Sequence, residues 1–328
     1  MKAIVYHKYG SPDVLRCEEV ERPTAGDDEV LIKVRAASVN PLDWHFMRGT
    51  PYFLRLMAGL RKPKLPRLGV DVAGKVEAVG RSVTQFKPGD EVFGSCRGAF
   101  AEYACTSESA LVIKPANVSF EQAAAVPVAA YTALQGLRDK GQIQPGQKVL
   151  INGAAGGVGT LAVQIAKWFG ADVTGVCSTR NVEMVRSIGA DQVIDYTRED
   201  FATSAQRYDL IFDCIGNHSL SACRRVLNSK GAYVSVAGGN GRWMIGSIAS
   251  ALIMPVLSWF SSQKAVSVLA KRSKEDLATM RELMEAGKVT PVIDRRYRLS
   301  EVPEAIRYLE EGHARGKVVI TMEAENKA

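Results

Sequence analysis

The sequence has few cysteines, and no two of them are spaced as a Cys-x-x-Cys pair. Six cysteines are scattered through its 328 residues: Cys17, Cys96, Cys105, Cys177, Cys214 and Cys223. Disulfide scaffolds and structural zinc sites use closely spaced cysteines, so this distribution excludes both and favours reduced thiols. The opening residues MKAIVYHKYGSP also lack the apolar core of a signal peptide. We therefore expect a cytoplasmic protein.

Acidic residues are missing from one stretch of an otherwise ordinary composition. The chain is long enough for about two domains, and its formal net charge of +7 is a mild excess. Between Trp44 and Val70, however, six basic residues stand without any acid: Arg48, Arg55, Arg61, Lys62, Lys64 and Arg67. A nucleic-acid patch and a solvated loop that favours anionic ligands both fit this pattern. We favour the loop and expect no nucleic-acid partner.

Charged residues of both signs are missing from residues 243–263. A run of about 18 apolar residues is the usual minimum for a membrane span. This run contains a proline in the middle, Pro255, and five serines: Ser247, Ser250, Ser258, Ser261 and Ser262. We therefore favour a buried or pocket-lining pair of helices over a membrane span. Peripheral membrane contact through residues 243–263 is the alternative.

The remaining residues divide the chain into a strand-rich part and an alternating part. Residues 1–118 contain short β-branched stretches separated by Gly, Pro and Asp turns. From residue 119 to 294, strand and helix signals alternate, with VTPVID (289–294) as the expected sixth strand. Alternation of this kind predicts an α/β fold with a parallel sheet that helices cover on both faces. Residues 295–328 add a capped helix and a final strand.

A glycine-rich turn lies in the alternating part, at KVLINGAAGGVGT (148–160). It joins a buried strand to a helix, as in dinucleotide-binding folds. Gly156 would let the backbone approach a pyrophosphate, and Gly159 would let the helix lie close to the strand. Ala154 stands where the first glycine of Gly-x-Gly-x-x-Gly is usual. The strand and helix on either side compensate for this departure, so we predict a nicotinamide dinucleotide site.

The residues after the next strand indicate whether the cofactor is NADH or NADPH. NAD enzymes usually carry an acid there for the ribose hydroxyl. This chain has Cys-Ser-Thr-Arg-Asn (177–181) instead. A 2′-phosphate would be repelled by an acid and held by the Ser178 hydroxyl and the Arg180 guanidinium. We therefore predict NADPH, with NADH and a loosely held ribose as the alternative.

The sequence resembles the zinc-free, quinone-oxidoreductase-like branch of the medium-chain dehydrogenase/reductase family. The resemblance runs from residue 1 to about 321 and includes VNPLDWHFMRG (39–49), LPRLGVDVAGKVEAVG (65–80), INGAAGGVG (151–159) and GHARGKVVI (312–320). It implies a GroES-like barrel made of residues 1–118 and 295–328. The dinucleotide-binding (Rossmann) domain, 119–294, would be inserted between these parts, with the nicotinamide in the cleft. A homodimer is implied as well.

The resemblance also implies positions for the cofactor. Gly156, Gly157, Val158 and Gly159 would bind the pyrophosphate, and Ser178 and Tyr196 would bind the adenosine 2′-phosphate beside Arg180. The others assigned to the cofactor are Thr132, Asn217, Ala237, Gly238, His313, Arg315 and Lys317. For two of the residues assigned to the cofactor, Tyr196 and His313, the alternative is a structural role without cofactor binding. Tyr196 is then an aromatic at a strand end, and His313 is a cation at a helix C-terminus.

The residues that would bind zinc are replaced. The zinc branch of the family uses Cys-x-x-Asp-x-His and Gly-His-Glu, whereas this chain has Asn40 in place of the cysteine and Val70 in place of the second histidine. Asp43 and His45 alone cannot complete a tetrahedral site. Without a Lewis acid, quinones and α,β-unsaturated carbonyls are the suitable substrates because they are already electrophilic. We therefore expect no metal.

Three residues are candidates for catalysis. Asn40 would donate a hydrogen bond to the substrate oxygen, and Asp43 would orient Asn40 or the ribose. Tyr52, on the basic loop, would donate a proton or close over the substrate. Alternatively, Asn40 is only a turn residue before Pro41, and Tyr52 only covers apolar surface.

The sequence thus predicts an NADPH-dependent reductase of quinones or enones. Reduction of acyl thioesters is a related alternative. The alternative from another class is an NADPH-binding protein whose main role is association with a membrane, RNA or a partner protein.

Overall fold

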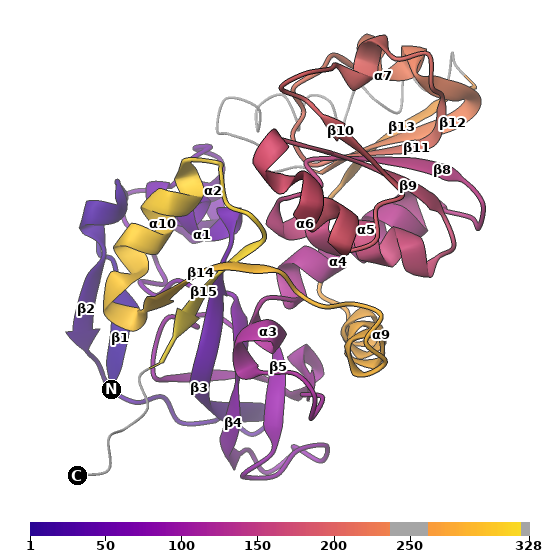
Figure 1. Cartoon of the computed structure of the whole chain (residues 1–328). Helices are drawn as coiled ribbons and strands as arrows, with labels where there is room; N and C mark the ends of the chain where they lie inside the picture. The colour runs from indigo at the N-terminus through magenta and orange to yellow at the C-terminus, as the bar shows by residue number, and fades with distance from the viewer. Residues whose placement is uncertain (237–261, 323–328) are drawn as a thin grey trace. The chain divides into compact units, whose positions relative to one another are not determined.

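A computed structural model describes residues 1–236 and 262–322 (Figure 1). The chain forms two compact units. Unit 1 comprises Met1–Val128, Arg272–Gly287 and Pro291–Ala328, and unit 2 comprises Ala129–Lys271 and Lys288–Thr290. Helix α9 (Lys274–Glu285), which the sequence assigned to the dinucleotide-binding domain, belongs to unit 1 because it packs against strand β7 (Leu111–Ile113). The predicted domain boundaries at residues 118 and 295 therefore differ from the limits of these units.

Unit 1 is built on a seven-stranded sheet with the order β14-β15-β3-β4-β5-β7, in which β6 also pairs with β3. These strands are β3 (Glu29–Val39), β4 (Asp71–Val79), β5 (Glu91–Ser95), β6 (Tyr103–Ser107), β14 (Ile293–Arg298) and β15 (Lys317–Thr321), together with β7. A separate pair consists of β1 (Lys2–Val5) and β2 (Arg16–Glu19). The C-terminal strand β15 pairs with β3 antiparallel, with Val318 opposite Val39. This register brings the last strand next to the end of β3.

Close backbone packing and apolar burial hold this sheet together. A Cβ atom on Gly74 in β4 would lie 2.3 Å from the carbonyl oxygen of Lys33 in β3, so only glycine permits this pairing. Ile4, Ile32 and Phe100 are fully buried in the core of the unit. Burial of such side chains supplies the main driving force for folding.

The helices of unit 1 are short apart from α9. They are α1 (Pro41–Arg48), α2 (Leu54–Ala58), α3 (Phe120–Ala124) and α10 (Val302–Glu310), with 3-10 turns at Pro12–Val14, Glu108–Ala110 and Leu299–Glu301. Helix α4 (Pro127–Gln135) crosses the boundary between the units in the sequence. Helix α1 begins with a capping box formed by Asn40 and Asp43 and ends at Gly49, whose φ is 60°. This cap fixes two of the predicted catalytic residues.

Unit 2 contains the predicted parallel sheet, with six strands in the order β10-β9-β8-β11-β12-β13. The strands are β8 (Lys148–Asn152), β9 (Asp172–Cys177), β10 (Gln192–Asp195), β11 (Tyr208–Asp213), β12 (Leu227–Val236) and β13 (Lys264–Val268). The helices are α5 (Gly157–Trp168), α6 (Val182–Ser187) and α7 (Leu220–Arg225), with η3 (Gly136–Lys140), η4 (Thr179–Asn181) and η5 (Phe201–Thr203). In Figure 1, α5 and α6 lie on one face of the sheet and α7 on the other. The prediction of an α/β fold with helices on both faces is confirmed.

The expected sixth strand at residues 289–294 was wrong. The sixth strand of unit 2 is β13, and Ile293 instead starts β14 in the sheet of unit 1. Both segments are short and rich in β-branched residues, so their sequences alone do not say which sheet each one joins. Between β10 and β11 the chain forms only the 3-10 turn η5, with Asp200 as its N-cap.

The uncharged run at 243–263 lies outside the described residues except for its last two positions. Its expected helix pair and its alternative, membrane contact, therefore stay predictions. No helix in the described ranges is both long and apolar enough to cross a membrane.

Candidate functional site

The glycine-rich turn of unit 2 lies where the order of the parallel sheet reverses. β8 has β9 on one side and β11 on the other, and the turn leads from β8 into α5. Open α/β sheets bind their ligands at such reversal points, at the carboxyl ends of the strands. Gly153 leaves the strand with a φ of 84°, a conformation that favours glycine, and Gly156 caps α5 in an extended conformation.

The turn fits a dinucleotide pyrophosphate. A Cβ on Gly159 would lie 2.0 Å from the carbonyl oxygen of Gly153, so glycine is needed for α5 to pack on the turn. A Cβ on Gly156 would meet nothing closer than 3.5 Å, so this glycine leaves room that a ligand can use. The N–H groups of the first helical turn, at Gly157, Val158 and Gly159, have no acceptor within the helix. They and the positive end of the helix dipole favour phosphate there.

The residues predicted for the adenosine end lie at the ends of two neighbouring strands. Ser178 follows β9, and its hydroxyl accepts a hydrogen bond from Nδ2 of Asn181 at 3.1 Å. Tyr196 follows β10, and its backbone N–H donates to the carbonyl oxygen of Cys177 at 3.0 Å. The side chains of Arg180 and Tyr196 are exposed. The structure therefore brings Ser178, Arg180 and Tyr196 to one edge of the sheet.

Sequence reasoning missed an acid at this edge. Asp195 at the end of β10 accepts hydrogen bonds from Oγ1 of Thr179 at 2.6 Å and Oγ1 of Thr197 at 2.8 Å. The bond from Thr179 is the main cause that lowers the pKa of Asp195. Each hydroxyl bonds a different oxygen of the carboxylate, so Asp195 joins β10 to the turn after β9. The sequence prediction missed Asp195 because it considered only the residues after β9, whereas Asp195 is the last residue of β10.

Asn217 is an exposed member of a hydrogen-bond network around the buried Asp213. Nδ2 of Asn152 donates to Oδ1 of Asp213 and to Oδ1 of Asn217, both at 2.9 Å. Oδ1 of Asp213 also accepts the backbone N–H groups of Ile215 at 2.9 Å and Gly216 at 2.8 Å. Its other oxygen accepts the hydroxyl of Tyr233 at 2.8 Å. Asp213 therefore fixes the turn that carries Asn217.

One feature of the sequence could have predicted this network. Asn152 and Asp213 are the polar last residues of two apolar strands, and both are buried. The hydrogen bond to Asp213 and burial raise the pKa of Tyr233, with burial the larger cause. Tyr233 therefore keeps its proton, and its hydroxyl donates a hydrogen bond to Asp213.

The other residues assigned to the cofactor are dispersed. Thr132 is buried in α4. His313 is exposed, and the backbone N–H of Arg315 donates to Oδ2 of Asp294 at 2.8 Å. Ala237 and Gly238 lie outside the described residues. The roles assigned to all these positions stay predictions.

Asn40 lies at the centre of a buried polar cluster in unit 1. Its Oδ1 accepts a hydrogen bond from Nζ of Lys317 at 2.6 Å. Its Nδ2 donates to Oδ2 of Asp71 at 2.9 Å and to the carbonyl oxygen of Ser38 at 3.3 Å. Asn40 is 2% exposed and Lys317 is 5% exposed. Both amide hydrogens of Asn40 are thus used within the protein, and a substrate oxygen would have to displace one of these acceptors.

Asp43 acts on Asn40 through the backbone. Its Oδ2 accepts the N–H of Asn40 at 2.8 Å, and its Oδ1 accepts the N–H of Gly69 at 3.0 Å. Burial raises the pKa of Asp43 from its ordinary value of 3.8 to about 7, and the backbone hydrogen bond from Asn40 opposes this shift. Asp43 therefore fixes the backbone at the start of α1, and its catalytic role in orienting Asn40 or the ribose stays a prediction.

Tyr52 and His45 differ sharply in exposure. Tyr52 is 73% exposed, and the guanidinium carbon of Arg55 lies 4.9 Å from the centre of its ring. His45 is buried, and its Nδ1 lies 2.9 Å from the carbonyl oxygen of Thr50. The catalytic role of Tyr52 stays a prediction.

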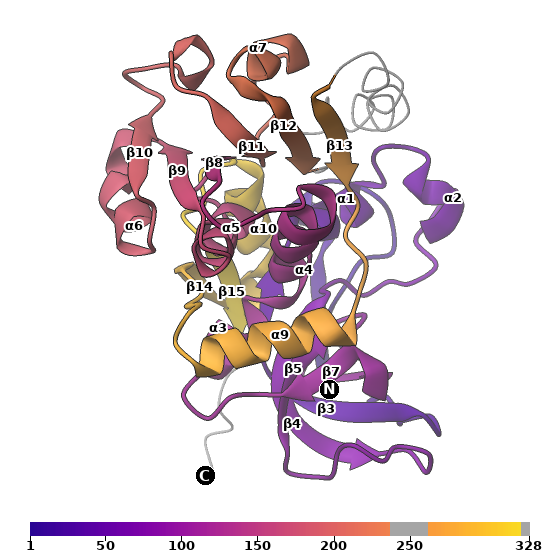
Figure 2. The same ribbon diagram turned by 90° about the vertical axis from the view of Figure 1, so that its right-hand side faces the viewer.

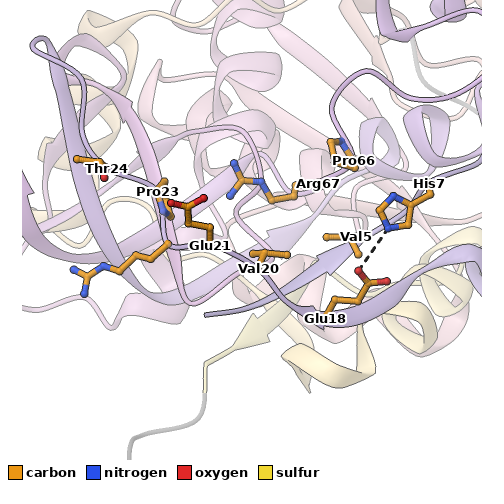
Figure 3. A pocket seen from close by; sticks show the side chains of 10 residues that line it. Val5, His7, Glu18, Val20, Glu21, Pro23, Thr24, Pro66 and Arg67 are labelled. Atoms are coloured by element: carbon orange, nitrogen blue, oxygen red, sulfur yellow. Dashed lines mark ion pairs between the residues drawn. The ribbon is translucent and has the colours of Figure 1, made fainter.

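Within the described ranges, neither a metal cluster nor the surface pocket beside β1 and β2 adds to this site. Among the described residues, no group of three or more His, Cys, Asp or Glu side chains could hold a metal ion. A surface pocket of about 420 Å³ lies beside β1 and β2 (Figure 3). There, Nε2 of His7 lies 3.5 Å from Oε2 of Glu18. None of the predicted site residues lines this pocket, so we assign it no role in catalysis.

Comparison with known proteins gives matches along the whole chain. Residues 26–116 match the alcohol dehydrogenase GroES-like domain family, and residues 188–320 match the zinc-binding dehydrogenase family. The chain is 37% identical to 2-methylene-furan-3-one reductase of Solanum lycopersicum, covering 98% of this chain and 79% of that protein. It is equally identical to the NADPH-dependent alkenal/one oxidoreductase of Arabidopsis thaliana, with the same coverage. Identity to a quinone oxidoreductase of Triphysaria versicolor is 35%, over 98% of both chains.

Solved structures agree with these relatives. The quinone oxidoreductase of Coxiella burnetii superposes with a TM-score of 0.87 and 33% identity, covering 98% of this chain and 99% of that one. The quinone oxidoreductase of Escherichia coli, solved in complex with NADPH, gives a TM-score of 0.82 at 26% identity, with 98% and 100% coverage.

We expect substitutions at Gly156 and Gly159 to affect different properties, NADPH binding and stability. Gly156→Ala should leave the melting temperature nearly unchanged but weaken NADPH binding about tenfold or more, because the added methyl group occupies ligand space. Gly159→Ala should lower the melting temperature by several degrees, because its methyl group would clash with the Gly153 carbonyl. Thermal unfolding without ligand and a fluorescence titration with NADPH separate the two effects. Normal NADPH binding by a folded Gly156→Ala protein would contradict the assignment of this turn.

The raised pKa of Asp43 predicts a pH-dependent stability. Between about pH 4 and pH 7 the folded protein holds a proton on Asp43 that the unfolded chain has released. This group therefore makes the free energy of unfolding fall as the pH rises through this range, and contributes no further slope above about pH 7. Asp43→Asn should remove this part of the slope in urea unfolding measured between about pH 5 and pH 8. The exposed Asp27→Asn serves as the control, and equal slopes in all three proteins would contradict the prediction.

Proposed function

The chain belongs to the quinone-oxidoreductase-like branch of the medium-chain dehydrogenase/reductase family, and we propose that it is a zinc-independent, NADPH-dependent reductase of quinones or α,β-unsaturated carbonyls. The observation that carries this proposal is the similarity, over 98% of this chain, to a quinone oxidoreductase and to an alkenal/one oxidoreductase, at 35% and 37% identity. The glycine turn supports the cofactor, because its geometry leaves room for a pyrophosphate at Gly156.

The chemistry of these substrates matches what the residues offer. NADPH supplies a hydride, which a quinone or enone accepts at carbon, and a proton then neutralises the oxygen. Negative charge develops on that oxygen during the transfer, so fixed hydrogen-bond donors and nearby positive charge accelerate the reaction. In unit 1 the ammonium of Lys317 and the amide of Asn40 are held 2.6 Å apart in a buried cluster. Tyr52 is our candidate for the proton donor.

We propose that Asn40 acts mainly by supporting its neighbours and not by donating to the substrate. Since both of its amide hydrogens already have acceptors, we assign it first to holding Lys317 and Asp71 in place. Donation to the substrate oxygen would then require the amide to exchange one of these partners. Both roles predict that Asn40 matters for turnover, but they differ in the effect expected of its neighbour Ser38.

The finer features of this proposal rest on the family resemblance. We propose a cytoplasmic homodimer, and analytical ultracentrifugation tests the oligomeric state. A protein that binds NADPH but reduces no quinone, enone or acyl thioester would instead be an NADPH-binding protein with a role in association.

The central experiment measures cofactor and substrate together. NADPH oxidation should depend on a member of a panel of quinones and enones and should survive strong chelators. NADPH should bind at least about tenfold tighter than NADH, and Arg180→Ala should remove much of this preference, since a charge-assisted hydrogen bond contributes about 1.5–3 kcal/mol. Arg186→Ala, on the neighbouring helix α6, is the matched control because Arg186 is exposed and pairs with Glu183. Equal affinities for NADPH and NADH in the unchanged protein would reject the cofactor assignment.

Asn40 is tested by two variants of the same cluster. Asn40→Ala should lower kcat about tenfold or more with little change in NADPH affinity, because a charge-stabilising donor or its support is lost. Ser38→Ala removes the hydroxyl that donates to Asp71 at 2.8 Å but leaves the Asn40 amide intact. If Asn40 acts by holding Asp71 and Lys317, Ser38→Ala should lower kcat as well. If Asn40 acts on the substrate, Ser38→Ala should keep most of the activity. Normal turnover by Asn40→Ala would reduce it to a turn residue.

A further inference from the structure

Exposed apolar side chains are concentrated in one short loop of unit 1. The described residues contain eleven exposed large hydrophobic side chains, and five of them lie between positions 52 and 65. They are Tyr52 (73% exposed), Phe53 (40%), Leu56 (70%), Leu60 (66%) and Leu65 (55%). Single exposed leucines are common on proteins, but a cluster of this kind marks an interaction site.

The same loop carries positive charge and no negative charge. Arg61, Lys62 and Lys64 are all exposed, and the sequence has no acid between Trp44 and Val70. Within the part of the chain that the structure describes, no carboxylate forms an ion pair with any of these three side chains. We call the five apolar and three basic residues together the 52–65 surface. Figure 2 shows helix α2, which carries part of it, at an outer edge of unit 1.

The 52–65 surface is held in shape by contacts beneath it. Nε of Arg55 donates to the carbonyl oxygen of Gly49 at 2.9 Å, and its guanidinium lies over the ring of Tyr9 at 4.5 Å. The hydroxyl of Tyr9 donates to the carbonyl oxygen of Gly59 at 2.5 Å. The backbone N–H of Lys64 donates to the carbonyl oxygen of Ala58 at 2.7 Å. The loop is thus anchored by polar contacts, while Leu56, Leu60 and Leu65 are exposed.

We propose that the 52–65 surface binds the surface of a phospholipid bilayer that contains anionic lipids. Leucine and phenylalanine side chains can enter the boundary between headgroups and acyl chains, and long basic side chains next to them reach the phosphates. The order Leu60-Arg-Lys-Pro-Lys-Leu65 places the basic residues between two exposed leucines, so both contacts form together. Each basic residue strengthens binding to an anionic surface about fivefold.

The chemistry of the surface favours lipid over nucleic acid. Sites for single-stranded nucleic acid stack the bases on aromatic rings. Three of the five exposed apolar side chains here are leucines, which offer no ring for stacking. The inference does not depend on the proposed reductase activity, because lipid binding needs neither NADPH nor a substrate.

Vesicle flotation tests the inference. The protein without ligand should float with vesicles of phosphatidylcholine and about 30% phosphatidylserine, much less with pure phosphatidylcholine, and less when the salt rises from about 0.1 M to about 0.5 M. Leu56→Glu/Leu60→Glu and Lys62→Glu/Lys64→Glu should each weaken binding about tenfold or more. The matched controls are Leu269→Glu, at a leucine that is 81% exposed in unit 2, and Lys230→Glu, at an exposed lysine. Both controls should bind as the unchanged protein does.

Several outcomes would overturn the inference. Absence of flotation, or equal losses in the surface variants and the two controls, would do so, provided that thermal unfolding shows all variants to be folded. A change in KM without any change in flotation would assign the 52–65 surface to substrate binding instead. Binding of a single-stranded RNA that Lys62→Glu/Lys64→Glu abolishes, in a protein that ignores vesicles, would assign the surface to nucleic acid.

Discussion

The buried carboxylate of Asp71 holds together segments of unit 1 that are far apart in the sequence. Its Oδ2 accepts hydrogen bonds from Oγ of Ser38 at 2.8 Å and Nδ2 of Asn40 at 2.9 Å, and Nζ of Lys317 lies 3.4 Å away. Its Oδ1 accepts the N–H of Val128 at 3.0 Å. One fully buried group thus connects the end of β3, the start of α1, the C-terminal strand and the start of α4. A buried charge is tolerated only with such partners, and losing one partner of a buried pair costs about 3–5 kcal/mol.

Unit 2 uses the same principle at its own carboxylate. Asp213 is 1% exposed and accepts hydrogen bonds from Asn152, Tyr233 and the backbone of the following turn. In each unit a satisfied acid stands at the end of a strand or the start of one, next to residues that we assign to cofactor or substrate. Such networks restrict side-chain rotation, and the rigidity they provide is what positions groups for hydride transfer.

The ammonium of Lys317 beside Asn40 bears on how the protein could work without zinc. Asn40 stands where the zinc branch of the family has a cysteine ligand, and here its carboxamide oxygen accepts the ammonium of Lys317. Unit 1 therefore carries a buried protein cation beside the predicted catalytic residue, balanced by Asp71. A cation held in a site of low dielectric interacts more strongly with developing negative charge than one in water does. The proposed reduction of quinones or enones therefore needs positive charge and hydrogen-bond donors but no Lewis acid.

The amino-acid sequence by itself determined the features that depend on local patterns. The strand, glycine turn and helix at 148–168 and the parallel sheet of unit 2 follow from periodicity and from turn residues at most a few positions apart. Sequence reasoning therefore predicted correctly that a glycine-rich turn joins β8 to α5, while the binding of the cofactor by these glycines stays a prediction. The family resemblance placed Tyr196 beside Ser178 and Arg180, and in the structure the ends of the neighbouring strands β9 and β10 bring all three to one edge of the sheet.

Only the tertiary structure decided which polar side chains share a buried site. Lys317 meets Asn40 across 277 positions of sequence, because β15 pairs with β3 in a register that no local pattern records. The amide hydrogens of Asn40, which the sequence had assigned to the substrate, are instead donated to Asp71 at the start of β4 and to the carbonyl oxygen of Ser38. Asp195 reaches Thr179 from another strand, and the sixth strand of unit 2 is β13 rather than residues 289–294. In each case the cause is strand pairing between distant segments, which depends on how the whole chain packs and not on the residues within one turn or strand.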